Sequence, residues 1–180
     1  MVQSLLHNPV NITVKSEPMK DRGIKQLFYK VEEPEKTALL LELLKDPAME
    51  SVLVFARTKK KADKICKAIN IANIRAKAIH GDKNQSERSN ALWIFKKKEA
   101  RVLVATDVAA RGIDINELTH VVNMNIPNVS ETYIHRIGRT GRAGQDGIAI
   151  SFCSGLEKYY LDEIEKLQGT KIKEMDMPLI

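Results

Sequence analysis

Residues 102–115 have the sequence VLVATDVAARGIDI, which begins with four consecutive apolar residues and then becomes polar. A short, continuously apolar run bounded by polar residues is typical of a strand that is buried on both faces of a parallel sheet. We therefore predict a strand at Val102–Ala105 and a short turn of helix at residues 107–111. A strand that leads through a polar loop into a helix is the repeating unit of α/β folds.

The same alternation of strand and helix recurs along the chain. Further strands are predicted at residues 24–31, 52–55, 76–79, 121–124 and 148–152. Further helices are predicted at residues 35–44, 58–70, 85–97, 129–137 and 154–168. We predict a single domain of the α/β class, with an open parallel β-sheet and helices on both faces.

Several residues have the positions of helix caps. Asn84 and Glu87 have the spacing of a capping box, and so do Ser154 and Glu157. Asn128 is a candidate cap for the helix that follows it. The last helix is predicted to bury one apolar face, formed by Leu156, Tyr160, Ile164 and Leu167.

Composition limits the class of protein. The 180 residues are 43% apolar and 29% charged, which is ordinary for a soluble globular domain. The formal net charge of +6 attracts polyanions such as nucleic acid. Cys66 and Cys153 lie among apolar residues, so we expect buried, reduced thiols and a cytoplasmic protein. No apolar run approaches the roughly 20 residues that span a bilayer, so no membrane partner is expected.

Two kinds of residue are assigned no chemical role. The four histidines and two cysteines lack the spacing of metal ligands, so no metal site is predicted. Trp93 lies on a predicted helix beside Leu92 and Phe95, and we expect it to pack in the core.

Polar clusters follow three of the predicted strands, at residues 57–61, 80–88 and 106–114. In open parallel sheets, ligands bind outside the carboxyl ends of the strands. We therefore expect these three segments to lie along one edge of the sheet and to form the functional site.

A cluster of arginines lies in residues 133–147, YIHRIGRTGRAGQDG. Arg136, Arg139 and Arg142 occur at every third position, and residues three apart share one side of a helix. Guanidinium groups form paired hydrogen bonds with phosphate oxygens, so the cluster indicates a phosphate or polyphosphate ligand. The alternative is a solvated arginine face that ends in a flexible loop.

The clusters after the strands carry groups that suit a nucleotide or a nucleic-acid backbone. Asp114 can accept hydrogen bonds from ribose hydroxyls, and Thr106 can bind a phosphate. A glycine turn at Gly81 leads into a helix N-terminus, a favourable position for phosphate, with Arg88 one turn further. The alternatives are a turn held by an ion pair between Arg111 and Asp114, and a capped helix with a solvated arginine.

These segments together resemble the DEAD-box RNA helicases, specifically the second, C-terminal, of their two RecA-like domains. HRIGRTGR at 135–142 is similar to motif VI of that family, and VATDVAARGID at 104–114 is similar to motif V. IHGDKNQSER at 79–88 resembles motif IVa, and VLVFARTK at 52–59 resembles motif IV. The resemblance extends from about residue 3 to residue 168, and the whole looks most like bacterial members.

The resemblance implies that ATP is the cofactor. Arg139 and Arg142 would reach the γ-phosphate of ATP held on the first RecA-like domain, with Arg142 as the arginine finger. Asp114 would contact the ribose. His135 and Arg136 would contact the first domain, which is the expected partner within the same parent chain.

The resemblance also implies that RNA is the second partner, bound through its backbone without regard to sequence. Thr106, Arg88 and the turn at Gly81 would hold RNA phosphates. Arg57, Thr58 and Lys59 would assist. In the parent protein, ATP and RNA would together close the two domains and part a short duplex.

The sequence contains neither a GxxxxGK[ST] phosphate loop nor a DEAD sequence. We therefore expect Mg²⁺ to be held by the absent N-terminal domain, and this chain alone to be inactive as an ATPase. Residues 1–22 are interpreted as an interdomain linker with the end of a preceding domain, and residues 23–180 as the helicase C-terminal domain, monomeric as a fragment.

Two other functions fit part of the sequence. One is a stand-alone, non-catalytic module that binds RNA or another protein. The other is a DNA-directed translocase of the same superfamily, which the HRIGRTGR form of motif VI disfavours.

Overall fold

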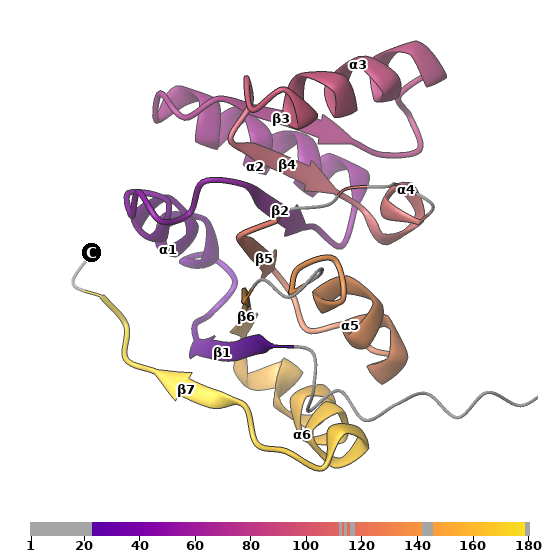
Figure 1. Ribbon diagram of the computed structural model, residues 1–180. Helices are drawn as coiled ribbons and strands as arrows, with labels where there is room; N and C mark the ends of the chain where they lie inside the picture. The colour runs from indigo at the N-terminus through magenta and orange to yellow at the C-terminus, as the bar shows by residue number, and fades with distance from the viewer. Residues whose placement is uncertain (1–22, 112, 114, 116–117, 142–145, 179–180) are drawn as a thin grey trace, which may run out of the picture.

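The computed structural model describes residues 23–111, 113, 115, 118–141 and 146–178. They form a seven-stranded sheet with the order β3-β4-β2-β5-β6-β1-β7 (Figure 1). All strand pairings of these residues are parallel. The predicted open parallel sheet is confirmed, while the expected linker at 1–22 lies outside the described residues.

The elements alternate along the chain as the sequence predicts, with boundaries that agree to within one residue except at the start of the last helix, where a 3-10 turn takes up residues 155–157. The strands are β1 (Ile24–Lys30), β2 (Val52–Phe55), β3 (Ala76–Ile79), β4 (Val102–Ala105), β5 (His120–Asn123), β6 (Gly147–Cys153) and β7 (Lys173–Met175). The helices are α1 (Lys36–Leu43), α2 (Lys59–Ile71), α3 (Gln85–Lys96), α4 (Asp107–Ala110), α5 (Ser130–Ile137) and α6 (Lys158–Gln168). Strand β7 has no counterpart in the sequence prediction.

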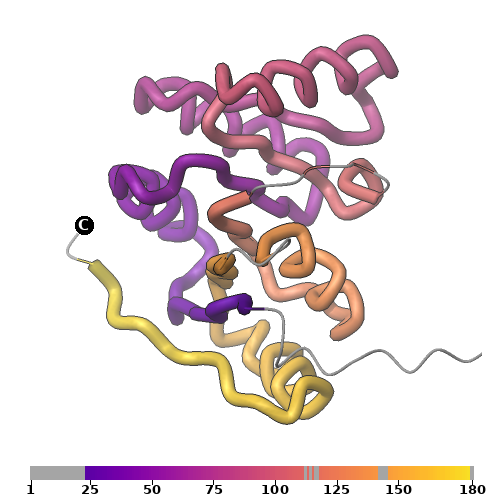
Figure 2. Tube along the Cα trace, in the orientation of Figure 1, coloured from indigo at the N-terminus to yellow at the C-terminus, as the bar shows by residue number. Residues whose placement is uncertain are grey.

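Helices cover both faces of the sheet, as predicted. Leu39 and Leu40 of α1 and Ile65 of α2 pack on one face, against residues such as Val54 and Val104. The other face is covered by α3 and α4 over β2 and β4, and by α5 and α6 over β1 and β6. The first and last described strands, β1 and β7, lie side by side at one edge (Figure 2).

The strand order places three loops next to one another. Strands β3, β4 and β2 are consecutive neighbours in the sheet. Because parallel neighbours end at the same edge, the segments that follow these strands leave the sheet together. This order explains why residues near positions 57, 81 and 106 can form one site.

Two of the three predicted helix caps are present. The Asn84 side chain accepts a hydrogen bond from the Glu87 amide at 2.9 Å, and the Glu87 carboxylate accepts one from the Asn84 amide at 2.8 Å. Ser154 and Glu157 form a second capping box, at a 3-10 turn before α6. The prediction for Asn128 is wrong, because Val129 is the N-cap residue of α5 and no side chain caps this helix.

The predicted apolar face of α6 is wrong for two of its four residues. Leu156 is 92% exposed and Leu167 is 50% exposed, whereas Leu161 and Ile164 are fully buried. The 3-10 turn before Lys158 changes the phase of the helix. Leu156 therefore lies outside α6 in solvent, and the buried face of the helix is formed by Leu161 and Ile164, with Tyr160 packed beside them.

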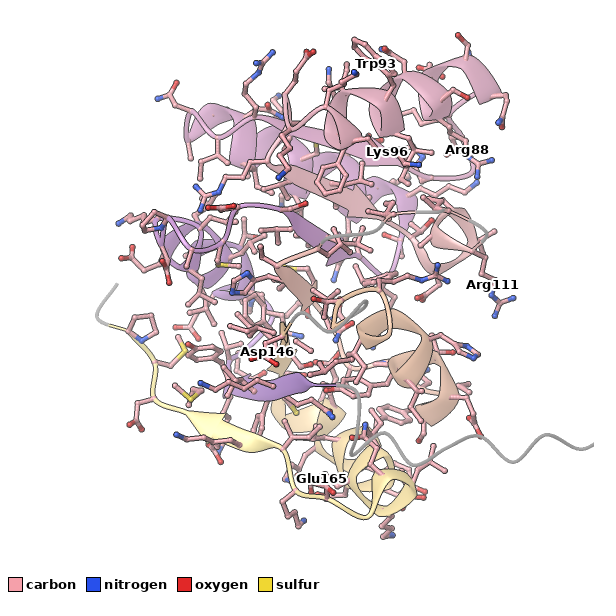
Figure 3. All side chains as sticks on the ribbon, viewed as in Figure 1. Arg88, Trp93, Lys96, Arg111, Asp146 and Glu165 are labelled. Carbon is pink, nitrogen blue, oxygen red and sulfur yellow. The ribbon has the colours of Figure 1, made fainter. Side chains whose placement is uncertain are left out.

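The prediction that Trp93 packs in the core is also wrong. Its side chain is 54% exposed and projects from the outer surface of α3 (Figure 3), while Phe95 is buried beneath the helix. Both thiols are free, and Cys153 is buried as predicted, whereas Cys66 is only half-buried. Burial raises the pKa of Cys153 to about 11, which keeps this thiol protonated at neutral pH.

No helix among the described residues is both long and apolar enough to span a membrane.

A substitution at Gly147, at the start of β6, tests how tightly the arginine-rich segment 133–147 is packed against the sheet. A Cβ atom at this position would lie 2.3 Å from Oγ1 of Thr140 and 2.4 Å from the backbone nitrogen of Gly141. We expect Gly147→Ala to destabilise the fold by about 1–3 kcal/mol, the usual cost of overpacking. Urea unfolding measures this. Gly155→Ala is the control, because a Cβ atom there would only reach ordinary contact distance, 3.5 Å from Glu32. Equal stability of the two variants would show that Gly147 is not tightly packed against Thr140 and Gly141.

The position of the buried face of α6 is tested by a pair of leucines. Leu161→Ala removes a fully buried side chain and should lower the free energy of unfolding by about 2–5 kcal/mol. Leu156→Ala changes an exposed side chain and should stay within about 0.5 kcal/mol of the wild type. The reverse order in urea unfolding would show that the face predicted from the sequence is the buried one.

Candidate functional site

The loops after β2, β3 and β4 enclose a groove at the carboxyl edge of the sheet, with a volume of ≈ 670 Å³. We call it the carboxyl-edge groove. Its lining residues are Arg57, Thr58, Lys59, Lys60, Gly81, Asp82, Thr106 and Val108. The structure therefore brings together five of the six residues predicted to bind RNA. The sixth, Arg88, is half-buried on α3, outside this lining, and is labelled in Figure 3.

Backbone geometry fixes the two threonines of the groove. Thr58 is the N-cap of α2, where its side chain accepts a hydrogen bond from the Lys61 amide. Thr106 is the N-cap of α4 and its side chain makes no capping bond. Gly81 lies so close to α2 that an added Cβ would stand 3.3 Å from Cε of Lys59. On one side of the groove the backbone of Gly81 lies close to α2. On the other side, the hydroxyl of Thr106 is not used as a helix cap.

The guanidinium of Arg57 is bonded to a buried carboxylate. Its Nη2 donates to Oε1 of Glu157 at 3.0 Å and to the Ile126 carbonyl at 3.2 Å. The other Glu157 oxygen accepts a bond from Lys36 at 2.6 Å, and both of these side chains are almost fully buried. Burial alone would raise the pKa of Glu157, but bonds from Lys36, Ser154 and Asn125 hold it below its usual value. Arg57 is therefore anchored to an ionised group.

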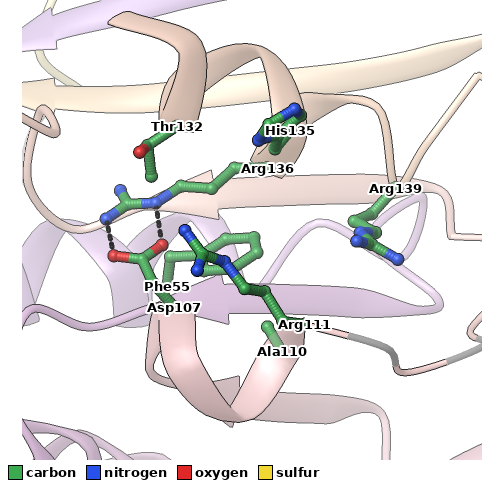
Figure 4. A pocket seen from close by; sticks show the side chains of 8 residues that line it. All are labelled: Phe55, Asp107, Ala110, Arg111, Thr132, His135, Arg136 and Arg139. Carbon is green, nitrogen blue, oxygen red and sulfur yellow. Dashed lines mark hydrogen bonds and ion pairs between the residues drawn. The ribbon is translucent and has the colours of Figure 1, made fainter. Parts of the chain in front are cut away.

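A second, smaller cleft lies beside α5, with a volume of ≈ 270 Å³ (Figure 4). Its lining residues are Phe55, Asp107, Ala110, Arg111, Thr132, His135, Arg136 and Arg139. We call it the α5 cleft. Among these residues Asp107 is the one carboxylate, so the described part of the cleft is strongly cationic.

Arg136 forms the floor of the α5 cleft and is only 4% exposed. Its Nε and Nη2 donate to the two carboxylate oxygens of Asp107 at 2.6 and 2.8 Å. Its Nη1 donates to Oδ1 of Asn123 at 3.2 Å and to the Asn125 carbonyl at 3.0 Å. The guanidinium also lies 5.0 Å from the ring centroid of Phe55. These contacts are all within the domain and do not test the predicted contact of Arg136 with another domain.

Arg136 and Arg139 do not share one helix face in the structure. Helix α5 ends at Ile137, so Arg139 belongs to the turn after the helix. Its Nη1 donates to the Ile113 carbonyl at 3.1 Å, and it lies apart from Arg136 in the cleft (Figure 4). His135 is exposed on the last turn of α5. Arg142 and Asp114 lie outside the described residues.

Sequence reasoning missed the acidic partners of the site. Asp107 neutralises Arg136, and Glu157 anchors Arg57 from 100 positions away. Asp107 could have been noticed as a carboxylate directly after Thr106, but no local pattern connects Glu157 to Arg57. Within the described ranges, no group of three potential metal ligands exists.

Comparison with known proteins gives the family. The model of the helicase conserved C-terminal domain matches residues 35–144. The ATP-dependent RNA helicase CshA of Listeria monocytogenes is 43% identical over 176 residues, which is 98% of this chain and 34% of that protein. The DEAD-box ATP-dependent RNA helicase RhpA of Helicobacter pylori is 39% identical over the whole chain and 37% of that protein. The chain thus spans about one third of the length of these relatives.

Solved structures agree with this assignment. A DEAD box protein from Methanococcus jannaschii is 41% identical with a TM-score of 0.79, over 86% of this chain and 42% of that one. Dbp5 of S. cerevisiae bound to RNA and ADP BeF3 is 31% identical with a TM-score of 0.84, over 97% of this chain and 47% of that one. The chain therefore belongs to the helicase conserved C-terminal domain family, among the C-terminal RecA-like domains of DEAD-box RNA helicases.

Proposed function

We propose that this chain is the half of an ATP-dependent RNA helicase that holds the RNA backbone and supplies arginines to ATP bound on a companion domain. The observation that carries the proposal is the convergence of Arg57, Thr58, Lys59, Gly81 and Thr106 in one groove from three separate loops. Among the structural relatives, yeast Dbp5 is described as bound to RNA and ADP BeF3.

The chemistry of the carboxyl-edge groove suits phosphates better than bases. Its lining offers two lysines, an arginine and two threonine hydroxyls, and no aromatic side chain on which a base could stack. Contacts of this kind fix a strand through its backbone and carry no sequence information. We therefore assign Arg57, Thr58, Lys59, Gly81 and Thr106 to RNA phosphates, with Arg88 as a further contact on α3.

The α5 cleft suits one end of a polyphosphate. Arg136 is paired with Asp107, and Arg111, His135 and Arg139 also line the cleft, so that the side chains around an incoming anion would be mainly nitrogen donors. ATP would supply the phosphoryl group to be transferred, with Mg²⁺ held by the companion domain. Arg139 and Arg142 then stabilise the negative charge of that group, with Arg142 as the arginine finger, and Asp114 accepts hydrogen bonds from the ribose.

The two sites are joined by a single turn of chain. Thr106 lines the carboxyl-edge groove, and the next residue, Asp107, is bonded to Arg136 in the α5 cleft. A shift of α4 on RNA binding would therefore move the carboxylate that holds Arg136. In the proposed mechanism His135 and the outer side of α5 face the companion domain, and closure of the two domains parts a short duplex. The two reduced thiols fit a cytoplasmic location.

The arginine finger is tested by mixing this chain with a separately produced first RecA-like domain and measuring ATP hydrolysis with RNA. Alone, the chain should hydrolyse essentially no ATP. Arg142→Ala should lower the rate of the mixture by about 10³-fold or more, because it removes the charge that counters phosphoryl transfer. Arg75→Ala, an exposed arginine before β3, is the matched control. Equal rates for wild type and Arg142→Ala, with both chains folded by circular dichroism, would favour a non-catalytic binding module.

The RNA contact of Arg88 is tested by binding of fluorescent single-stranded RNAs of several sequences. Arg88→Gln should weaken all of them to a similar extent and lower the slope of log K against log salt by about 0.7, since one phosphate contact is lost. Arg75→Gln should leave the slope unchanged. A loss confined to one sequence would mean that Arg88 contacts a base. Tighter binding of DNA than RNA by the mixed domains would favour the translocase.

A further inference from the structure

A second groove lies along the free edge of β3, between α2 and α3, with a volume of ≈ 430 Å³. We call it the β3 groove. Strand β3 is the last strand on its side of the sheet, so the side of β3 that points away from β4 forms part of the groove wall. The polar residues that matter here are Asp63, Lys67, Lys77, Lys83 and Glu87.

The acidic residues of the β3 groove are already engaged. Asp63 lies 3.0 Å from Nε2 of His80 and 3.6 Å from Nζ of Lys83. Glu87 accepts the Asn84 amide in the capping box of α3. Lys67 and Lys77 are exposed, and neither has a carboxylate within ion-pair distance among the described residues. The lining therefore has three lysines and two carboxylates, a formal net charge of +1, and Lys67 and Lys77 are its two lysines without an ion-pair partner in the described part of the chain.

The β3 groove adjoins the carboxyl-edge groove. Neighbouring residues of one loop line the two grooves, Asp82 the first and Lys83 the second. Two ion pairs tie this loop to α2, Lys59 with Asp82 at 2.5 Å and Lys83 with Asp63. A polyanion that leaves the carboxyl-edge groove past Gly81 thus meets the lysines of the β3 groove next.

The wall of the β3 groove does not favour a peptide that pairs with the sheet. Oδ1 of Asn70 accepts a bond from the Ala76 amide at 3.1 Å, and its Nδ2 donates to the Ala76 carbonyl at 3.1 Å. The side-chain amide thereby occupies the outward-facing pairing position of Ala76. A ligand of this groove is accordingly recognised through the lysine side chains.

We propose that the β3 groove is a second RNA-binding surface, in which Lys67 and Lys77 bind phosphates of the strand that leaves the carboxyl-edge groove. The inference rests on the proposed RNA-binding function and adds an extension of the site over α2 and β3. It predicts that a longer RNA makes two phosphate contacts that a short RNA cannot reach. Each contact adds about 0.7 to the slope of log K against log salt for a single strand.

The test compares single-stranded RNAs of about 4 and about 16 nucleotides, the span of known single-strand site sizes, on this chain at several salt concentrations. Lys67→Gln/Lys77→Gln should reduce the slope for the long RNA by about 1.4 and leave the slope for the short RNA unchanged. The control is Lys30→Gln/Lys173→Gln, which removes the same charge from β1 and β7 at the other side of the sheet. Both control lysines are exposed.

Different outcomes would overturn the RNA-binding role of the β3 groove and the proposed function of the chain. If short RNA binds and the double variant leaves the slope for long RNA intact, the β3 groove does not bind RNA and the proposed function stands. If neither RNA binds, the proposed function itself fails. Amide chemical shifts in the β3 groove should move with the long RNA only. If an oligoglutamate peptide moves them and the long RNA does not, the surface belongs to an acidic protein partner.

Discussion

The ion pair between the buried Arg136 and the partly exposed Asp107 is the contact on which both parts of the candidate site depend. It joins the last turn of α5 to the first turn of α4 through two hydrogen bonds. A bidentate pair of this kind fixes distance and orientation together. Removing Asp107 would leave the nearly buried guanidinium of Arg136 without its counter-ion, which destabilises the fold. Arg136 is therefore a structural member of the arginine cluster, whatever contact it makes beyond the domain.

The fold could be predicted from the sequence because its signal is local. Runs such as Val102–Ala105 are apolar throughout, and their burial on both sides of the sheet is what the structure shows. The position of the site followed from the same signal, because parallel strands end at one edge. That Arg57, Gly81 and Thr106 share a groove was thus predictable before any contact was known.

The errors arise where distant residues decide the outcome. Leu156 is apolar and regularly spaced, but the 3-10 turn before α6 leaves it in solvent. Trp93 fits a core pattern, yet the sheet beneath α3 is already filled by Ala91 and Phe95. The anchoring of Arg57 by Glu157 joins residues 100 positions apart. Periodicity reports which face of one helix is apolar, and it carries no information on partners supplied by another element.

The bonds of Asn70 to the backbone of Ala76 have a consequence for how copies of this domain meet one another. An unpaired edge strand is a template for edge-to-edge association and aggregation. Here an incoming strand would first have to displace two hydrogen bonds, each worth about 1 kcal/mol. A side chain in the last turn of α2 thus protects the open edge of the sheet at Ala76, so that the groove beside β3 can stay open to solvent without pairing to a second copy of the chain.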